Sequence, residues 1–95
     1  MEIVGRHIPN RLTKHRMIHG LRQKEVAALL GHTSTAQLSQ WERGEAMPGV
    51  LNLLKLCIIF ATSPNELYYD LFKEQQAFIA EKLQAFSTGA DSQLS

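Results

Sequence analysis

Apolar positions recur every three or four residues along most of the chain, the spacing of amphipathic helices. In residues 23–30, for example, Val26, Ala27 and Leu30 fall on one face. Strict alternation of apolar and polar residues, the pattern of a half-buried strand, is not found. The sequence therefore predicts an all-α fold, with helices at residues 10–19, 23–30, 35–43, 50–61 and 63–86.

Local signals mark where these helices begin and end. Three glycines follow the first three helices, where glycine readily takes a left-handed cap conformation: Gly20, Gly31 and Gly44. Ser34, with Gln37 three residues later, has the pattern of a capping box at the start of the third helix. The run Ser63–Glu66 predicts the start of the fifth helix by a capping serine, a proline at the first position and a glutamate.

The last two helices differ in their apolar pattern. Residues 50–61 are apolar nearly all round, which is typical of a central core helix. In residues 63–86, by contrast, Phe72, Ile79 and Phe86 recur every seven residues. Such a helix must either fold back on its own core or pair with a second copy. We predict pairing and leave the first alternative open; the predicted dimerisation residues are Leu71, Phe72, Phe78, Ile79, Leu83 and Phe86.

Composition limits the class of protein. A length of 95 residues with 44% apolar residues fits one domain with one core. No apolar run approaches the roughly 18 residues of a membrane span, and polar residues interrupt any signal-peptide pattern at the start of the chain. The single cysteine, Cys57, excludes an internal disulfide, lies in an apolar helix and is typical of a small core residue in a reducing compartment. We expect a soluble cytoplasmic protein.

The charges are unevenly distributed. The net charge is +1, but residues 1–50 carry +3 and residues 51–95 carry −2. A basic half suggests that one end of the molecule faces a polyanion. The imbalance is small, so charge alone gives only a weak indication of nucleic acid.

Residues with catalytic or metal-binding chemistry form no convincing set. His15 and His19 are four residues apart, which suits a metal, but no third ligand is near them in sequence. There is no phosphate-binding glycine loop, and no nucleophile can be matched with a base. We expect no enzyme activity, metal, cofactor or small-molecule substrate.

Several separate motifs resemble the Cro/phage-repressor (Xre-like) helix-turn-helix family. They are Leu21–Gly31, then Leu38–Gly44 with Pro48, and finally Phe60–Leu67. The pattern has physical reasons: Ala27 is small where two helices would cross, and Gly31 lies where the chain must turn. The resemblance covers residues 11–71.

This resemblance implies a compact five-helix bundle of the lambda-repressor-like type, here with an extended C-terminal helix. It also implies that the third helix enters the major groove of DNA and that the second lies against the phosphate backbone. A further implication is a buried ion pair between Arg16 and Glu42, which would fix helix packing rather than contact DNA.

The third helix has a face suited to contacting bases. If Leu38 and Trp41 point inward, the opposite face has short or amide side chains and no charge between Ser34 and Trp41. Amides pair with adenine, hydroxyls donate or accept, and methyl groups contact thymine. The predicted base-contacting residues are Thr35, Ala36, Gln37, Ser39 and Gln40.

Phosphate contacts are expected around the start of the second helix, where backbone amides and the helix dipole attract anions. The predicted phosphate-binding residues are Arg22, Gln23, Lys24, Arg43, Arg11 and Lys14. The chain departs from the family pattern at Arg22, which stands where a serine or threonine cap is usual. It also departs in the longer turn of residues 31–34, and at Glu45, where a basic residue would favour DNA.

The sequence thus predicts a dimeric repressor that binds specific double-stranded DNA in the cytoplasm, at the nucleoid, of a prokaryote or phage. The alternative is an antitoxin or interaction module that binds a partner protein through its C-terminal helix. We divide the chain into an N-terminal arm (1–9), a helix-turn-helix domain (10–71), a C-terminal helix (72–86) and a disordered tail (87–95).

Overall fold

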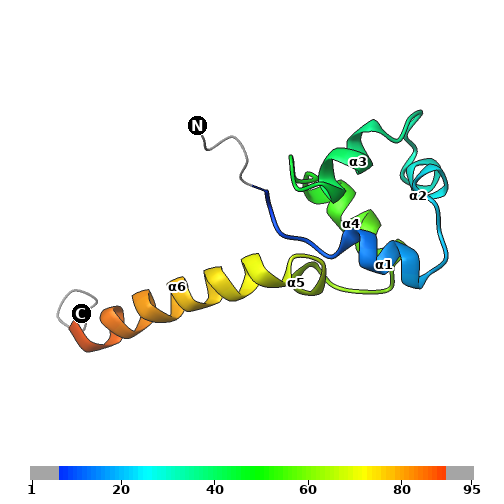
Figure 1. Ribbon diagram of the computed structural model, residues 1–95. Coiled ribbons are helices and arrows are strands. Elements are labelled where there is room, and N and C mark those ends of the chain that lie inside the picture. The colour runs from blue at the N-terminus through cyan, green and yellow to red at the C-terminus, as the bar shows by residue number, and fades with distance from the viewer. Residues whose placement is uncertain (1–6, 90–95) are drawn as a thin grey trace.

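The computed structural model describes residues 7–89, and within that range the fold is all-helical, as predicted. The six helices are α1 (Leu12–Ile18), α2 (Gln23–Leu30), α3 (Ala36–Glu42), α4 (Val50–Ile59), α5 (Pro64–Leu67) and α6 (Tyr69–Gly89) (Figure 1). Residues 1–6 of the predicted arm and 90–95 of the predicted tail lie outside the described residues.

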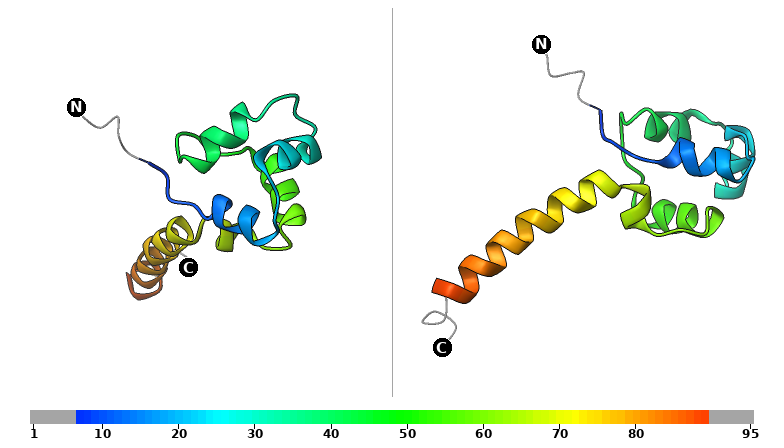
Figure 2. Two further views of the ribbon diagram at one scale, coloured as in Figure 1. Left: turned by 45° about the vertical axis from the view of Figure 1, so that its right-hand side comes forward. Right: turned by 60° about the horizontal axis from the view of Figure 1, so that its bottom comes forward.

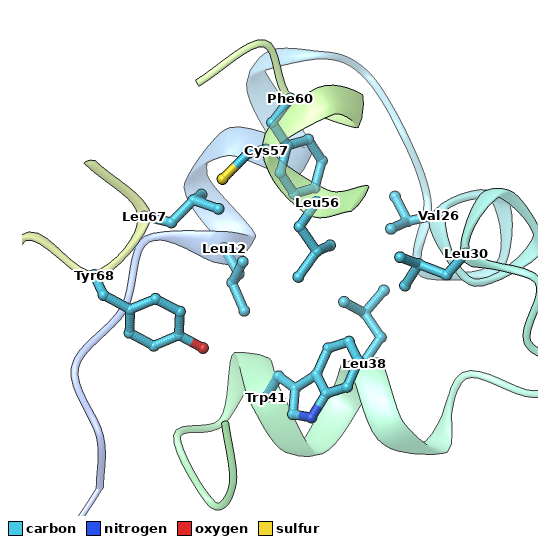
Figure 3. Close-up of a cluster of buried hydrophobic side chains, with 10 residues drawn as sticks. All are labelled: Leu12, Val26, Leu30, Leu38, Trp41, Leu56, Cys57, Phe60, Leu67 and Tyr68. Carbon is cyan, nitrogen blue, oxygen red and sulfur yellow. The ribbon is translucent and has the colours of Figure 1, made fainter. Parts of the chain in front are cut away.

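One core holds α1 to α5 together (Figure 3). Each of these helices contributes buried apolar side chains, and the cluster consists of Leu12, Val26, Leu30, Leu38, Trp41, Leu56, Cys57, Phe60, Leu67 and Tyr68. Cys57 is a core residue, as predicted, and burial raises the pKa of its thiol. Full burial of one large apolar side chain is worth about 1.5–3 kcal/mol, so this cluster is the main source of stability.

Two glycines end helices where the backbone requires them. Gly31 has φ 85°, and the amide of His32 donates to the carbonyl of Ala27 (2.9 Å), which closes α2 with a Schellman motif. Gly44 has φ 75°, and a Cβ there would lie 2.5 Å from the Ile8 carbonyl oxygen. The amide of Ile8 donates to the Gly44 carbonyl (2.9 Å), so the chain before α1 lies against the end of α3.

The predicted fifth helix is in fact two helices. Tyr68, with φ −120° and ψ 51°, interrupts the helix between α5 and α6. The break turns the Tyr68 ring into the core, where burial raises the pKa of its hydroxyl to about 12. The second difference is at the C-terminal end, because α6 continues to Gly89 and residues 87–89, assigned above to the tail, are helical.

α6 leads away from the domain formed by α1 to α5 (Figure 2). The radius of gyration is 17.4 Å, whereas a compact chain of this length has about 12 Å. Every residue from Phe72 to Thr88 is exposed. The helix therefore does not fold back on its own core, which was the alternative left open by its apolar pattern.

Candidate nucleic-acid interface

α3 is attached to the domain through one face. Leu38 and Trp41 are 0% and 4% exposed, as the interpretation of this helix required. The other side faces solvent: Ala36, Gln37 and Gln40 are exposed, and the two remaining predicted base-contacting residues, Thr35 and Ser39, are half-buried. The structure thus brings the predicted set together on one uncharged surface.

The turn between α2 and α3 is held against α3 by an aromatic contact. The His32 ring packs edge-on against Trp41, with ring centroids 5.8 Å apart. The predicted capping box at Ser34 is not formed: Thr35 is the N-cap and its side chain makes no capping bond, while the Ser34 hydroxyl accepts from the Ala36 amide (3.3 Å). α3 accordingly begins at Ala36.

Arg16 and Glu42 form a bidentate ion pair between α1 and the end of α3. The Nε and Nη2 atoms of Arg16 lie 2.6 and 3.1 Å from the two carboxylate oxygens. The side chains are 16% and 6% exposed. The Nη1 atom of Arg16 also donates to the Leu21 carbonyl (3.1 Å), which ties the segment before α2 to the same site.

Glu42 accepts two further hydrogen bonds, from Gln23 Nε2 (2.8 Å) and Thr13 Oγ1 (3.0 Å). Burial by itself raises the pKa of Glu42, but the bonds from Arg16, Gln23 and Thr13 together outweigh it and leave the pKa below its usual value. This one carboxylate therefore fixes the start of α2 relative to the end of α3. The side-chain amide of Gln23, predicted to bind phosphate, is occupied by Glu42.

The predicted basic contacts fall into two groups. Arg22, Lys24 and Lys14 are exposed on α1 and at the start of α2. Arg11 instead faces α5 and α6: its Nη1 atom lies 3.0 Å from Glu66, and its guanidinium lies 4.4 Å from the centre of the Tyr69 ring. Arg11 thus stabilises the fold on that side.

Arg43 lies at the end of α3 beside the predicted base-contacting surface. It donates to the Ser39 hydroxyl and makes two bonds to Glu45, of 2.9 and 3.0 Å. The hydrogen bonds from Arg43 lower the pKa of Glu45, which stays ionised and offsets the positive charge of Arg43. Glu45, the departure from the family pattern noted above, is thus the direct partner of a predicted phosphate contact.

Asn10 is a positioning residue that the sequence interpretation missed. Its Nδ2 atom donates to the Ile8 and Trp41 carbonyls (3.1 Å each), and its Oδ1 atom accepts from the Leu12 amide (3.0 Å). The side chain joins the start of α1 to the end of α3. An asparagine just before a helix is a known capping signal that was available in the sequence.

Glu66 was recognised only as a helix-capping residue. In the structure it accepts from His15 Nε2 (3.1 Å) as well as from Arg11, and the bonds from His15 and then Arg11 lower its pKa. The Nδ1 atom of His19 donates to the carbonyl of His15 (3.0 Å). No cluster of three metal-ligating side chains occurs among residues 7–89.

The short helices α2 and α3, joined by the turn of residues 31–35, form a helix-turn-helix unit. Its second helix presents an uncharged outer face. Residues 12–67, more than half of the chain, match the helix-turn-helix family HTH_3. The chain belongs to the Cro/C1-type helix-turn-helix family. Membership of this family makes it a DNA-binding regulator. Comparisons with curated proteins and with solved structures gave no match.

The family match also delimits the domain. It begins at Leu12, the first residue of α1, and ends at Leu67, directly before the break at Tyr68. α6 lies outside the matched region. None of the helices described, α6 included, is both long and apolar enough to cross a membrane.

Proposed function

We propose that this protein is a dimeric transcriptional repressor that binds a specific double-stranded DNA sequence with α3 in the major groove. The observation that carries the proposal is the uncharged, exposed face of α3, attached through Leu38 and Trp41. Gln37 and Gln40 present amides that can bind adenine bidentately, and the Ala36 methyl group suits the thymine methyl. An ordinary surface helix would present lysine and glutamate instead.

Phosphate contacts would set the position of α3 on the duplex. The backbone amides at the start of α2, with Arg22 and Lys24 beside them, suit the DNA backbone on one side of the groove. Arg43 would supply a contact at the other end of α3, and Lys14 a weaker one. Gln23 acts indirectly, because its bond to Glu42 holds α2 at a fixed angle to α3.

α6 supports the dimeric form of the proposal. Its apolar side chains are about half exposed, at 44% for Phe72, 50% for Ile79 and 47% for Phe86. A row of exposed apolar side chains along one face of a helix marks an interaction site. Two copies joined through α6 would form a twofold dimer, which matches a near-palindromic operator in the nucleoid of the cytoplasm.

The same exposed helix supports the second candidate function, binding of a different protein, as an antitoxin does. The two functions differ in what α6 contacts. Deletion of residues 77–95 separates them: loss of self-association with weakened operator binding supports the repressor, whereas loss of a foreign partner from an already monomeric chain supports the second candidate.

Selection from random duplex DNA at near-physiological salt tests the proposed function. We expect enrichment of an inverted repeat whose half-sites are about 10 base pairs apart, one helical turn. Salt-sensitive binding without enrichment of any sequence would contradict the proposal and favour a protein partner.

A further inference from the structure

An apolar groove lies in the angle between α4, α5 and the first turns of α6. Its volume is about 310 Å³, and its apolar lining consists of Met47, Leu53, Pro64, Tyr68, Leu71 and Phe72. Met47 is 48% exposed and Leu53 is half-buried, so the groove is open to solvent. An apolar hollow of this kind fits an apolar side chain from another chain.

The groove is continuous with the apolar stripe of α6. Phe72 belongs to both, since it lines the groove and is the first residue of the stripe Phe72, Ile79 and Phe86. Gln75, on the same side of the helix, also lines the groove. A helix lying along the stripe would therefore have one end at the groove.

The stripe is symmetric about Ile79. Phe72 and Phe86 each lie seven residues from it, about 10.5 Å along the helix axis. If two copies of α6 pair in opposite directions with the Ile79 residues facing each other, the partner's Phe86 lies beside Phe72. By the twofold symmetry of such a dimer, the same contact forms twice.

Charge favours this direction over the parallel one. The Lys82 ammonium lies 5.3 Å from the centre of the Phe78 ring, so it lies beside the apolar surface. In a parallel pair each residue faces its own copy, and the two Lys82 charges would meet. In the antiparallel pair Lys82 faces the partner's Gln76, and no two like charges oppose each other.

The area that a stable dimer needs also points to the groove. A helix of 21 residues is about 31 Å long, and a pair of helices touches along a strip only about 10 Å wide. Specific interfaces bury roughly 800 Å² on each partner. Contact with the groove enlarges the interface beyond the strip.

We propose that the groove is the docking site for the C-terminal end of α6 from a second copy, which inserts Phe86 beside Phe72, Met47 and Leu53. This assignment rests on the proposed function for the existence of a dimer, and adds its direction and the domain residues that take part. The C-terminal end of each α6 is then covered by the other copy's domain.

Disulfide trapping tests the direction. Phe72→Cys and Phe86→Cys are made in separate chains, mixed and oxidised mildly. Gln75→Cys with Leu83→Cys gives a second pair, which keeps both phenylalanines. We expect each mixture to cross-link at least about tenfold more than either variant alone. The paired residues lie beside each other only when the two α6 helices run in opposite directions. The wild-type chain, with buried Cys57, is the control.

A charge placed in the groove tests the docking site. Met47→Glu is expected to raise the Kd of the full-length dimer at least tenfold, a typical effect at a buried interface position. Ile58→Glu is the matched control: Ile58 is 79% exposed on α4, outside the groove, and the change should leave the Kd within about twofold.

The outcomes separate the inference from the proposed function. Cross-linking of each variant only with itself, or equal Kd values for Met47→Glu and wild type, would overturn the inference even if an inverted repeat is selected. The expected cross-links without any selected DNA sequence would uphold the inference and contradict the proposed function. A wild-type chain that stays monomeric overturns the docking site.

Discussion

The α1–α5 domain and α6 contain similar side chains in opposite surroundings. Phe60 in the domain is 1% exposed, while Phe86 in α6 is 47% exposed; Leu38 is 0% exposed and Leu83 is 61%. The domain has a buried core of its own and pairs Arg16 with Glu42 beside it, whereas every residue of α6 from Phe72 to Thr88 is exposed. An apolar face in a sequence thus shows that burial is needed, but not whether the covering surface is in the same chain.

The limits of the family match agree with this division. The match ends where the self-contained core ends, and α6 begins two residues later. We interpret the domain as the part that binds DNA and α6 as the part that joins copies. The predictions below test whether the two regions are as separate as this interpretation requires.

The largest effect is expected from breaking the ion pair of the domain. Arg16→Leu leaves Glu42 with only its bonds from Gln23 and Thr13, and loss of one partner of a buried pair costs about 3–5 kcal/mol. We expect a loss of about 3 kcal/mol in the free energy of unfolding, measured by urea denaturation. Lys14→Leu, on the exposed side of α1, is the control and should change it by less than about 0.5 kcal/mol; equal losses would refute the role of the pair.

An intermediate effect on operator binding is expected from a glutamine-to-alanine substitution in α3, and none from the same substitution in α6. Gln40→Ala on α3 should weaken binding to the selected operator by about 1–3 kcal/mol and relax the preference at one base pair. Gln84→Ala, on exposed α6, should leave operator affinity unchanged. Titration of labelled duplexes measures both, and similar losses at the two sites would argue against α3 as the base-contacting helix.

A pH effect is expected in the domain. The folded-state pKa of Glu42 is lowered, so its contribution is complete above the unfolded-state pKa of about 4.3 and is lost as pH falls through the lower folded-state value. Thermal unfolding between pH 7 and pH 3 should show the Tm of wild type and of Glu42→Gln converging at the acid end. A constant difference across this range would mean that the carboxylate charge is not what stabilises the site.

The smallest effect is expected at the edge of the interface. Glu45→Gln removes the charge that opposes Arg43, so all duplexes should bind more tightly, with a salt slope steeper by about 0.9, one phosphate contact. Glu81→Gln on α6 changes the net charge equally and is the control. If both variants respond alike, net charge and not the release of Arg43 explains the gain.

The sequence predicted the parts of this fold that depend on local rules. The bounds of α2, the left-handed Gly31 and the buried pair Leu38 and Trp41 follow from spacing and capping, and the structure confirms them. The break at Tyr68 was missed, because Ser63–Glu66 is a helix start and nothing after it resembles a stop. The break arises from packing of the Tyr68 ring into the core, which no local pattern shows.

The candidate site was predicted less completely than the fold. The exposed set on α3 followed from one assumption about which face is buried. The hydrogen-bond partners of Gln23, Arg11 and Arg43 could not be predicted in this way, since each bond joins residues on different elements or depends on the orientation of a side chain. These bonds show which of the predicted contacts already have a partner within the described residues.

Sedimentation equilibrium of the full chain and of Ile79→Glu tests the central claim, that the domain is complete in one copy while α6 is not. We predict a dimer mass for the wild-type chain and a monomer mass for the variant, with the same unfolding free energy of the domain in the monomeric state. A wild-type chain that remains monomeric at every concentration, or a variant that still dimerises, would contradict the account.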